Sequence, residues 1–248
     1  MKNTNNRYNK SKLNDIFMNE NNELANIALK YNSIKLCDPE TIHYIKHYNN
    51  LFKPIKDDVL NLLEIGVKKG DSLKIWKDYF INSNIYGFDI NDEHFKVLEN
   101  IPRISVHLVD QTDIVGMNKF LDHNQLLSKF DIIIDDGGHT QEQVQTSFRF
   151  LFEYGLKNKG IYIIEDLGCS YWYEFGGGIN TPGTSIEFLK SLIDGLNFRF
   201  WKNGRITGSN KPPFKHKSST YLDKNIESVQ FFKGLCIIKK GNNVHDEA

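Results

Sequence analysis

One stretch of the chain, residues 61–89, constrains the fold more than any other. It begins with the apolar run Leu62-Leu63-Glu64-Ile65, which is followed at once by Gly66 and Gly70. A helical pattern comes next, with apolar residues at steps of three and four, and a second apolar run then ends at Asp89. This order of strand, glycine turn, helix, strand and acid predicts the opening unit of a doubly wound α/β sheet.

The glycine turn of this unit predicts a ligand site. Gly66 and Gly70 let the backbone approach a ligand closely, and Asp89 lies where a carboxylate can bind ribose hydroxyls. The segment Gly66-Val67-Lys68-Lys69-Gly70 departs from the G-x-G-x-x-G pattern of dinucleotide-binding folds. The acid two residues before the first glycine, Glu64, resembles the form in class I S-adenosylmethionine methyltransferases, which implies that Glu64 helps to fix the methionine part of that cofactor. A purely structural strand-to-helix turn is the alternative.

Length and composition indicate one folded domain. The 248 residues are 40% hydrophobic, so we expect a single domain over residues 23–240, with flexible tails at residues 1–22 and 241–248. Lys plus Arg equal Asp plus Glu, 31 against 31, which argues against a nucleic-acid partner. With no membrane-spanning run, no signal peptide and three widely spaced cysteines, a cytoplasmic location is expected.

A helix is expected over residues 94–100. A third strand is expected over residues 104–109, and it ends in Asp110 and Gln111. Polar side chains just beyond a strand lie where open α/β sheets bind ligands, so either of these residues is a candidate contact for adenine. The alternative is an Asx turn that leads into the next helix.

Two later apolar runs, residues 130–134 and residues 161–164 after Gly160, are expected to form strands. Each ends in a pair of acids, Asp135-Asp136 and Glu165-Asp166. Because neighbouring parallel strands end at the same edge, up to four carboxylates would meet there, a set that suits Mg²⁺, Mn²⁺ or Ca²⁺. The alternative is that one acid of each pair caps the next helix. His139, three residues after Asp136, is a candidate general base, although a lone histidine is more often structural.

The rest of the chain predicts supporting elements. Residues 24–52 have a helical pattern in which Tyr44 and Tyr48 are interpreted as core aromatics, and residues 185–196 have the pattern of an amphipathic helix. Residues 169–184 combine aromatics with glycines, which suits a substrate loop that carries Tyr171 and Trp172, or a plain flexible turn. An insertion loop is expected over residues 199–223, followed by a hairpin over residues 229–238.

Taken together, these segments resemble the metal-dependent sugar O-methyltransferases related to the macrocin and mycinamicin enzymes, with cephalosporin hydroxylase-like proteins similar over a shorter span. The segments that carry the resemblance include LLEIGVKKGDSLKIWKDYF, YGFDI, VDQTD, FDIIIDDGGH, GIYIIEDL and the VQFF–LCIIKKG hairpin. The resemblance implies a Rossmann-like fold with a seven-stranded, mostly parallel sheet, N-terminal helices and a C-terminal antiparallel hairpin. It implies Mg²⁺, or Mn²⁺, on Asp136, Glu165 and Asp166, with His139 as the base. It places the cofactor S-adenosylmethionine at Glu64, Gly66, Gly70, Ser72, Asp89, Asp110, Gln111 and Asp135.

The function expected from this resemblance is methylation of a sugar hydroxyl, with a nucleotide-linked or glycan sugar for a bacterial surface polysaccharide as the favoured acceptor. A phosphoramidate or other small capsule precursor, a catechol-like diol, and a non-catalytic S-adenosylmethionine-binding protein are the alternatives. A nucleotide-binding oxidoreductase is disfavoured by the glycine spacing and the closing hairpin. The partners expected are a small molecule and, in an oligomer, further copies of the same chain.

Overall fold

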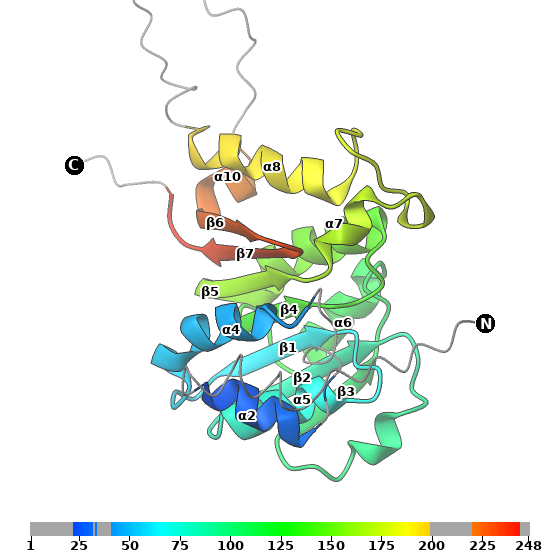
Figure 1. Ribbon diagram of the computed structural model, residues 1–248, viewed down its shortest axis with the longest axis vertical. Coiled ribbons are helices and arrows are strands. Elements are labelled where there is room, and N and C mark those ends of the chain that lie inside the picture. The colour runs from blue at the N-terminus through cyan, green and yellow to red at the C-terminus, as the bar shows by residue number, and fades with distance from the viewer. Residues whose placement is uncertain (1–21, 32, 34–40, 199–219, 244–248) are drawn as a thin grey trace, which may run out of the picture. The chain divides into compact units, whose positions relative to one another are not determined.

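The computed structural model describes residues 22–31, 33, 41–198 and 220–243. The chain divides into two compact units, residues 1–109 and residues 110–248, which are described separately (Figure 1). The expected tails, except for Asn22 and residues 241–243, lie outside the described residues. So do residues 199–219 of the expected insertion loop.

The first unit contains three parallel strands in the order β3-β2-β1. In this register Leu63 lies opposite Tyr86, and Tyr86 lies opposite Ser105. Helix α5 connects the first two strands, and α2 packs against both α4 and α5. The elements are α2 (Glu23–Lys30), α4 (Tyr44–Phe52), η2 (Lys53–Ile55), β1 (Asn61–Ile65), α5 (Asp71–Tyr79), β2 (Asn84–Asp89), η3 (Phe95–Val97) and β3 (Ile104–Leu108).

Aromatic side chains form much of the core of this unit. Trp76 makes edge-to-face contacts with Tyr48 and Phe52, at ring-centroid distances of 5.3 and 5.9 Å. Phe52 makes a further contact with Phe80 at 5.2 Å. Because Tyr44 and Tyr48 are 1% and 0% exposed, the prediction that they are core aromatics is confirmed. Such pairs add to the free energy gained from burial alone.

The second unit contains four strands in the order β4-β5-β7-β6. Strands β4 and β5 are parallel, whereas β7 runs antiparallel to β5 and to β6. Helix α7 packs on β4, and α8 packs on α7 and β6 (Figure 1). The elements are α6 (Ile114–His123), β4 (Phe130–Asp135), α7 (Gln141–Phe150), η4 (Leu151–Gly155), β5 (Leu156–Ile164), η5 (Leu167–Tyr171), η6 (Tyr173–Phe175), α8 (Ser185–Leu196), α10 (Tyr221–Asn225), β6 (Ile226–Phe232) and β7 (Leu235–Lys240).

The end of α7 is joined to the last strand by a buried lysine. Helix α7 passes into a π-helical turn, η4, whose wider spacing leaves carbonyl groups without the usual helical donors. The Nζ of Lys240 donates to the carbonyls of Phe152, Glu153 and Leu156 at 2.6, 3.0 and 2.7 Å. Lys240 is 5% exposed, and its ammonium therefore fastens β7 to this turn.

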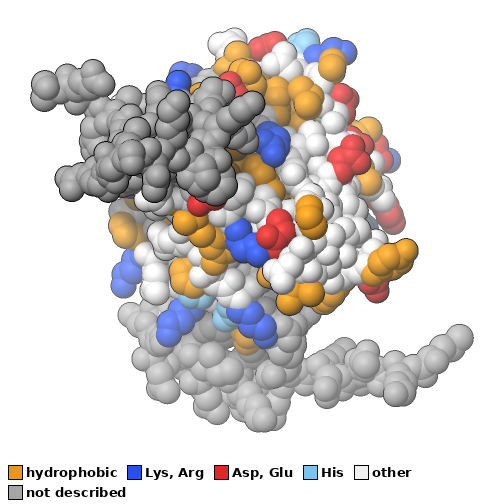
Figure 2. Space-filling view, turned by 90° about the horizontal axis from the view of Figure 1, so that it is seen from above, with side chains coloured by type: hydrophobic (Ala, Val, Ile, Leu, Met, Phe, Trp, Pro, Cys, Tyr) orange, Lys and Arg blue, Asp and Glu red, His pale blue; other side chains and the backbone are white. Residues whose placement is uncertain are grey.

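The expected Rossmann-like sheet, with seven mostly parallel strands and a C-terminal antiparallel hairpin, is confirmed. Three details differ from the sequence prediction. Residues 221–223 of the expected insertion loop belong to helix α10. The helix expected over residues 94–100 is only the 3₁₀ turn η3, and β5 begins at Leu156 instead of after Gly160. No described helix is long and apolar enough to cross a membrane. On the face shown in Figure 2, both signs of charge occur, in keeping with the zero net charge.

Candidate metal and catalytic site

A cluster of two carboxylates and an imidazole lies beyond the parallel strands β4 and β5. Asp135 lies opposite Ile164 in this strand pair, and the amide of Glu165 donates to the carbonyl of Asp135 at 3.0 Å, so the two strands end side by side. The residues that follow, Asp136 and Asp166, thereby approach one another. Together with His139 they offer ligand atoms that all lie within 4.8 Å of one another.

Backbone geometry separates the two members of each acidic pair. Asp135 and Glu165 are 1% and 2% exposed, whereas Asp136 and Asp166 are partly exposed and join the cluster. Asp135 is the last residue of β4, whereas Asp136, Glu165 and Asp166 follow the ends of β4 and β5, where the chain turns into loop. Asp166 has the positive φ of 52°, and it makes no side-chain cap to the short helix that it precedes. Glu165 is not a member of the cluster, so its role as a metal ligand stays a prediction.

His139 faces both carboxylates of the cluster. Its Nε2 lies 3.8 Å from the Oδ1 of Asp136 and 3.6 Å from the Oδ2 of Asp166. Its backbone has a φ of 60°, an uncommon conformation for a residue other than glycine, although histidine adopts it more readily than most residues. Its Nδ1 is buried and makes no hydrogen bond to the described residues. A cation or an acceptor molecule would supply a partner for this cluster.

The surroundings of the cluster carry negative charge. Burial raises the pKa of the nearby Cys169 to about 11, and the negative charges of Asp166, Asp136 and Glu174 contribute to the same shift. The negative charges of three carboxylates therefore all affect the Cys169 thiol, which lies next to the cluster. The carboxylate oxygens of Asp136 and Asp166 are donors that suit Mg²⁺ or Mn²⁺, and a bound cation would relieve the repulsion between them.

An aromatic loop runs beside the cluster. The ring of Phe175 lies 6.5 Å from that of His139 and 6.1 Å from that of Trp172. Gln141 holds the loop, because its Nε2 donates to the carbonyl of Phe175 at 3.0 Å. Tyr171 and Trp172 are 47% and 54% exposed, so these predicted substrate contacts present aromatic surface close to the cluster.

Three candidate cofactor residues in the second unit bond within the protein. Asp110 accepts hydrogen bonds from the amide and the hydroxyl of Thr112, both at 2.8 Å, which is the Asx turn considered as the alternative. Asp135 accepts a hydrogen bond from Ser147 at 2.5 Å and a weaker one from Gln111 at 3.2 Å. Complete burial raises the pKa of Asp135, and these hydrogen bonds oppose the rise.

The first unit carries the other cofactor candidates. The carboxylate of Glu64 is fully buried and accepts a hydrogen bond from the indole of Trp76 at 3.0 Å. One oxygen of Asp89 accepts from the amides of Val67 and Lys68, at 2.9 and 3.0 Å, so it orders the turn between the two glycines. Gly66 and Gly70 have φ values of 91° and 73°, which L-residues rarely adopt, and Ser72 lies in the first turn of α5.

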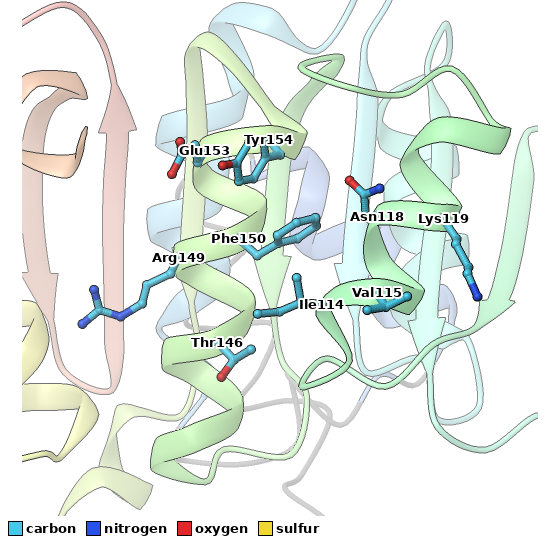
Figure 3. Close-up of a pocket in the computed structure, with 9 residues that line it drawn as sticks. All are labelled: Ile114, Val115, Asn118, Lys119, Thr146, Arg149, Phe150, Glu153 and Tyr154. Carbon is cyan, nitrogen blue, oxygen red and sulfur yellow. The ribbon is translucent and has the colours of Figure 1, made fainter. Parts of the chain in front are cut away.

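Sequence reasoning did not find the apolar pocket between α6 and α7 (Figure 3). Its volume is about 740 Å³, and Ile114 and Phe150 face each other across it. Besides α6, the pocket is lined by the later residues of α7 and by η4. The acidic cluster lies near the other end of α7, where its residues Asp136 and His139 precede the first turn. Ile114 and Val115 are exposed at this pocket in the structure, but in the sequence they are indistinguishable from core positions of an amphipathic helix.

No family model matches the chain. Curated relatives do match it, among them the mycinamicin VI 2''-O-methyltransferase of Micromonospora griseorubida, which is 34% identical over 212 residues, 81% of this chain and 48% of the relative. The 8-demethyl-8-alpha-L-rhamnosyl tetracenomycin-C 2'-O-methyltransferase of Streptomyces olivaceus is 33% identical over 89% of this chain and 55% of the relative. The demethylmacrocin O-methyltransferase of Streptomyces fradiae is 32% identical over 81% and 49%.

A solved structure of MycE, a methyltransferase of the mycinamycin biosynthetic pathway in complex with Mg and SAH, superposes with a TM-score of 0.73. Its sequence is 31% identical, and the match covers 90% of this chain and 54% of MycE. The chain is a homologue of these sugar O-methyltransferases. The homologue has their Rossmann-like class I methyltransferase fold, and it spans about half the length of the curated relatives it matches.

Proposed function

We propose that this homologue transfers the methyl group of S-adenosylmethionine to a sugar hydroxyl, with a divalent cation bound in its acidic cluster. The observation that carries the proposal is the convergence of Asp136, His139 and Asp166 beyond β4 and β5, in a chain related to sugar O-methyltransferases. A MycE structure with Mg, SAH and mycinamycin VI supports a cation, a cofactor and a sugar-bearing acceptor in this fold.

The proposed cation ligands are Asp136 and Asp166, with Glu165 as a third. A divalent cation bound by these residues supplies a Lewis acid, which lowers the pKa of the acceptor hydroxyl. His139 takes the proton from that hydroxyl. Its Nε2 lies 3.8 Å from the Oδ1 of Asp136 and 3.6 Å from the Oδ2 of Asp166, so the proposed base stands directly beside the proposed cation ligands.

The proposed cofactor contacts begin with the first unit, where Glu64 binds the methionine part and Asp89 binds the ribose. The open conformations of Gly66 and Gly70 leave backbone close to a ligand, and Ser72 follows in the same turn. Asp110 stays a candidate for the adenine, because its second carboxylate oxygen accepts neither bond from Thr112.

The acceptor is expected to lie against Tyr171 and Trp172, whose exposed rings suit the face of a sugar. The sugar itself, nucleotide-linked or part of a glycan for a surface polysaccharide, stays a prediction, as does assembly into a homo-oligomer. The relatives are named for sugars attached to antibiotics, so neutral glycosides belong beside nucleotide sugars in any substrate panel.

The test is release of S-adenosylhomocysteine against this panel, with and without EDTA, for the wild type and for His139→Ala. We expect metal-dependent turnover on one acceptor and a loss of turnover in His139→Ala, with cofactor affinity retained. His123→Ala is the matched control, since His123 is an exposed residue of α6. Turnover that survives EDTA would contradict the cation site, and a full-activity His139→Ala would contradict the base. Cofactor binding without turnover on any acceptor would favour a non-catalytic binding protein.

A further inference from the structure

The side chain of Gln111 is used inside the second unit and not at its surface. It is 4% exposed. Its Nε2 lies 3.2 and 3.4 Å from the two carboxylate oxygens of Asp135 and 3.3 Å from the hydroxyl of Ser147. Its Oε1 accepts a hydrogen bond from the amide of Gly138 at 2.9 Å. Both amide protons and one acceptor site of Gln111 are therefore engaged, which leaves little capacity for a ligand.

The bond to Gly138 acts on the loop that carries the proposed chemistry. Gly138 lies between Asp136, a proposed cation ligand, and His139, the proposed base. On its other side the loop is held by the capping box of α7, in which Thr140 and Gln143 bond to each other's backbone. A side chain at Gly138 would collide with the amide of Gln143, so the loop has little freedom to move toward α7.

Asp135, to which Gln111 donates, is itself buried. Asp135 accepts hydrogen bonds from Ser147 at 2.5 Å and Tyr162 at 3.3 Å, which belong to α7 and β5. Since both donors lie on packed elements, the carboxylate of Asp135 is held in one position. Gln111 bonds to this carboxylate through its Nε2 and to the amide of Gly138 through its Oε1, so it links the loop to Asp135. Groups in such buried networks stabilise one arrangement because an unpaired member is costly.

We infer that Gln111 is a positioning residue that holds the loop from Asp136 to His139 in place, rather than a contact of the adenine. The catalytic role of this loop depends on the proposed function. The positioning role of Gln111 depends only on its hydrogen bonds to Asp135 and Gly138. A displacement of about 1 Å at reacting groups can reduce turnover by about 100-fold, so the loss of this hold should appear in kcat.

The test replaces Gln111 with methionine, which has a similar length but no hydrogen-bonding amide. In Gln111→Met we expect kcat to fall by about 10- to 100-fold, with the KM of the acceptor and the Kd of S-adenosylmethionine within about twofold. Amide exchange at Gly138, followed by NMR, should become faster. Gln230→Met is the matched control, since Gln230 is exposed on β6. If Gln111→Met unfolds, Ser147→Ala carries the same test, because it removes the shortest bond to Asp135 from the other side.

The outcomes separate this inference from the proposed function. A weaker affinity for S-adenosylmethionine with kcat unchanged at saturation would overturn the inference and make Gln111 a cofactor contact. If the wild type transfers no methyl group, the proposed function fails. The rate of amide exchange at Gly138 then tests the positioning role of Gln111 by itself. Faster exchange at Gly138 in Gln111→Met supports the positioning role, and unchanged exchange overturns it.

Discussion

Lys240 offers a sharp test of how the second unit is held together. Its ammonium uses its three protons on three carbonyls, of Phe152, Glu153 and Leu156. Lys240→Met keeps an apolar stem of similar length and removes all three donors. The bonds to Phe152 and Leu156 are buried, so their carbonyls would lose hydrogen bonding without gaining water.

The expected cost follows from these contacts. Each buried carbonyl left without a donor costs about 1–3 kcal/mol, or about 4 kcal/mol for two. Burial lowers the pKa of Lys240 to about 8, which shows that the buried ammonium is itself unfavourable, and removing it returns part of this energy. We therefore expect the free energy of unfolding to fall by about 3 kcal/mol. For a chain of this size the melting temperature would fall by about 6–12 °C.

The neighbouring lysine provides the matched control. Lys239 pairs with Glu227 at 2.7 Å, but the side chains of the two residues are 42% and 47% exposed. Such surface pairs contribute about 0–1 kcal/mol, so Lys239→Met should leave the melting temperature nearly unchanged. Thermal and urea unfolding followed by circular dichroism measure both variants. Equal effects of the two substitutions would refute the reasoning, because the difference between them is burial and the carbonyl acceptors.

Three further predictions concern the site and the first unit. Asp166→Asn should weaken Mn²⁺ binding, measured by electron paramagnetic resonance, at least about tenfold, while the exposed control Asp122→Asn should not; equal affinities would place the cation elsewhere. Trp76→Phe removes the indole donor of the buried Glu64 and should cost about 2 kcal/mol in urea unfolding, whereas Trp172→Phe, at a half-exposed ring, should cost less than about 0.5 kcal/mol. Burial opposes ionisation of Asp78, but hydrogen bonds from Lys30, Tyr31 and Lys77 outweigh it and hold the pKa of Asp78 below its usual 3.8. The stability that Asp78 contributes should therefore be complete above about pH 4 and be lost as the pH falls further, so the penalty of Asp78→Asn should shrink in acid; a penalty that is the same at pH 7 and in strong acid would contradict this account.

The elements of the sheet were predictable because each depends on a short pattern. The apolar runs before Gly66, Asp89 and Asp135 became β1, β2 and β4, and Lys233-Gly234 joins the expected hairpin. The helix expected over residues 94–100 failed because its apolar pattern is too short to decide between one turn and several. β5 begins at Leu156, before Gly160, because pairing with β4 extends it beyond its own apolar run.

The roles of individual polar residues were less predictable. The sequence shows Asp135 and Asp136 as equals, yet one is buried under Ser147 and Tyr162 and the other lies in the cluster. Gln111 was a candidate adenine contact by its position after a strand. Its hydrogen bond to Gly138, 27 residues later, depends on pairing that no local pattern records.

The sequence by itself determined which strands form, in which direction they run, and that acids and a histidine collect beyond two of them. Hydrophobic periodicity and turn residues are local, so they are legible in one dimension. Only the tertiary structure decided which acid faces the cluster, that Lys240 caps a π-helical turn, and that a glutamine supports the loop of the proposed base. These outcomes depend on which distant donors and acceptors burial brings within hydrogen-bonding distance, and that is set by packing.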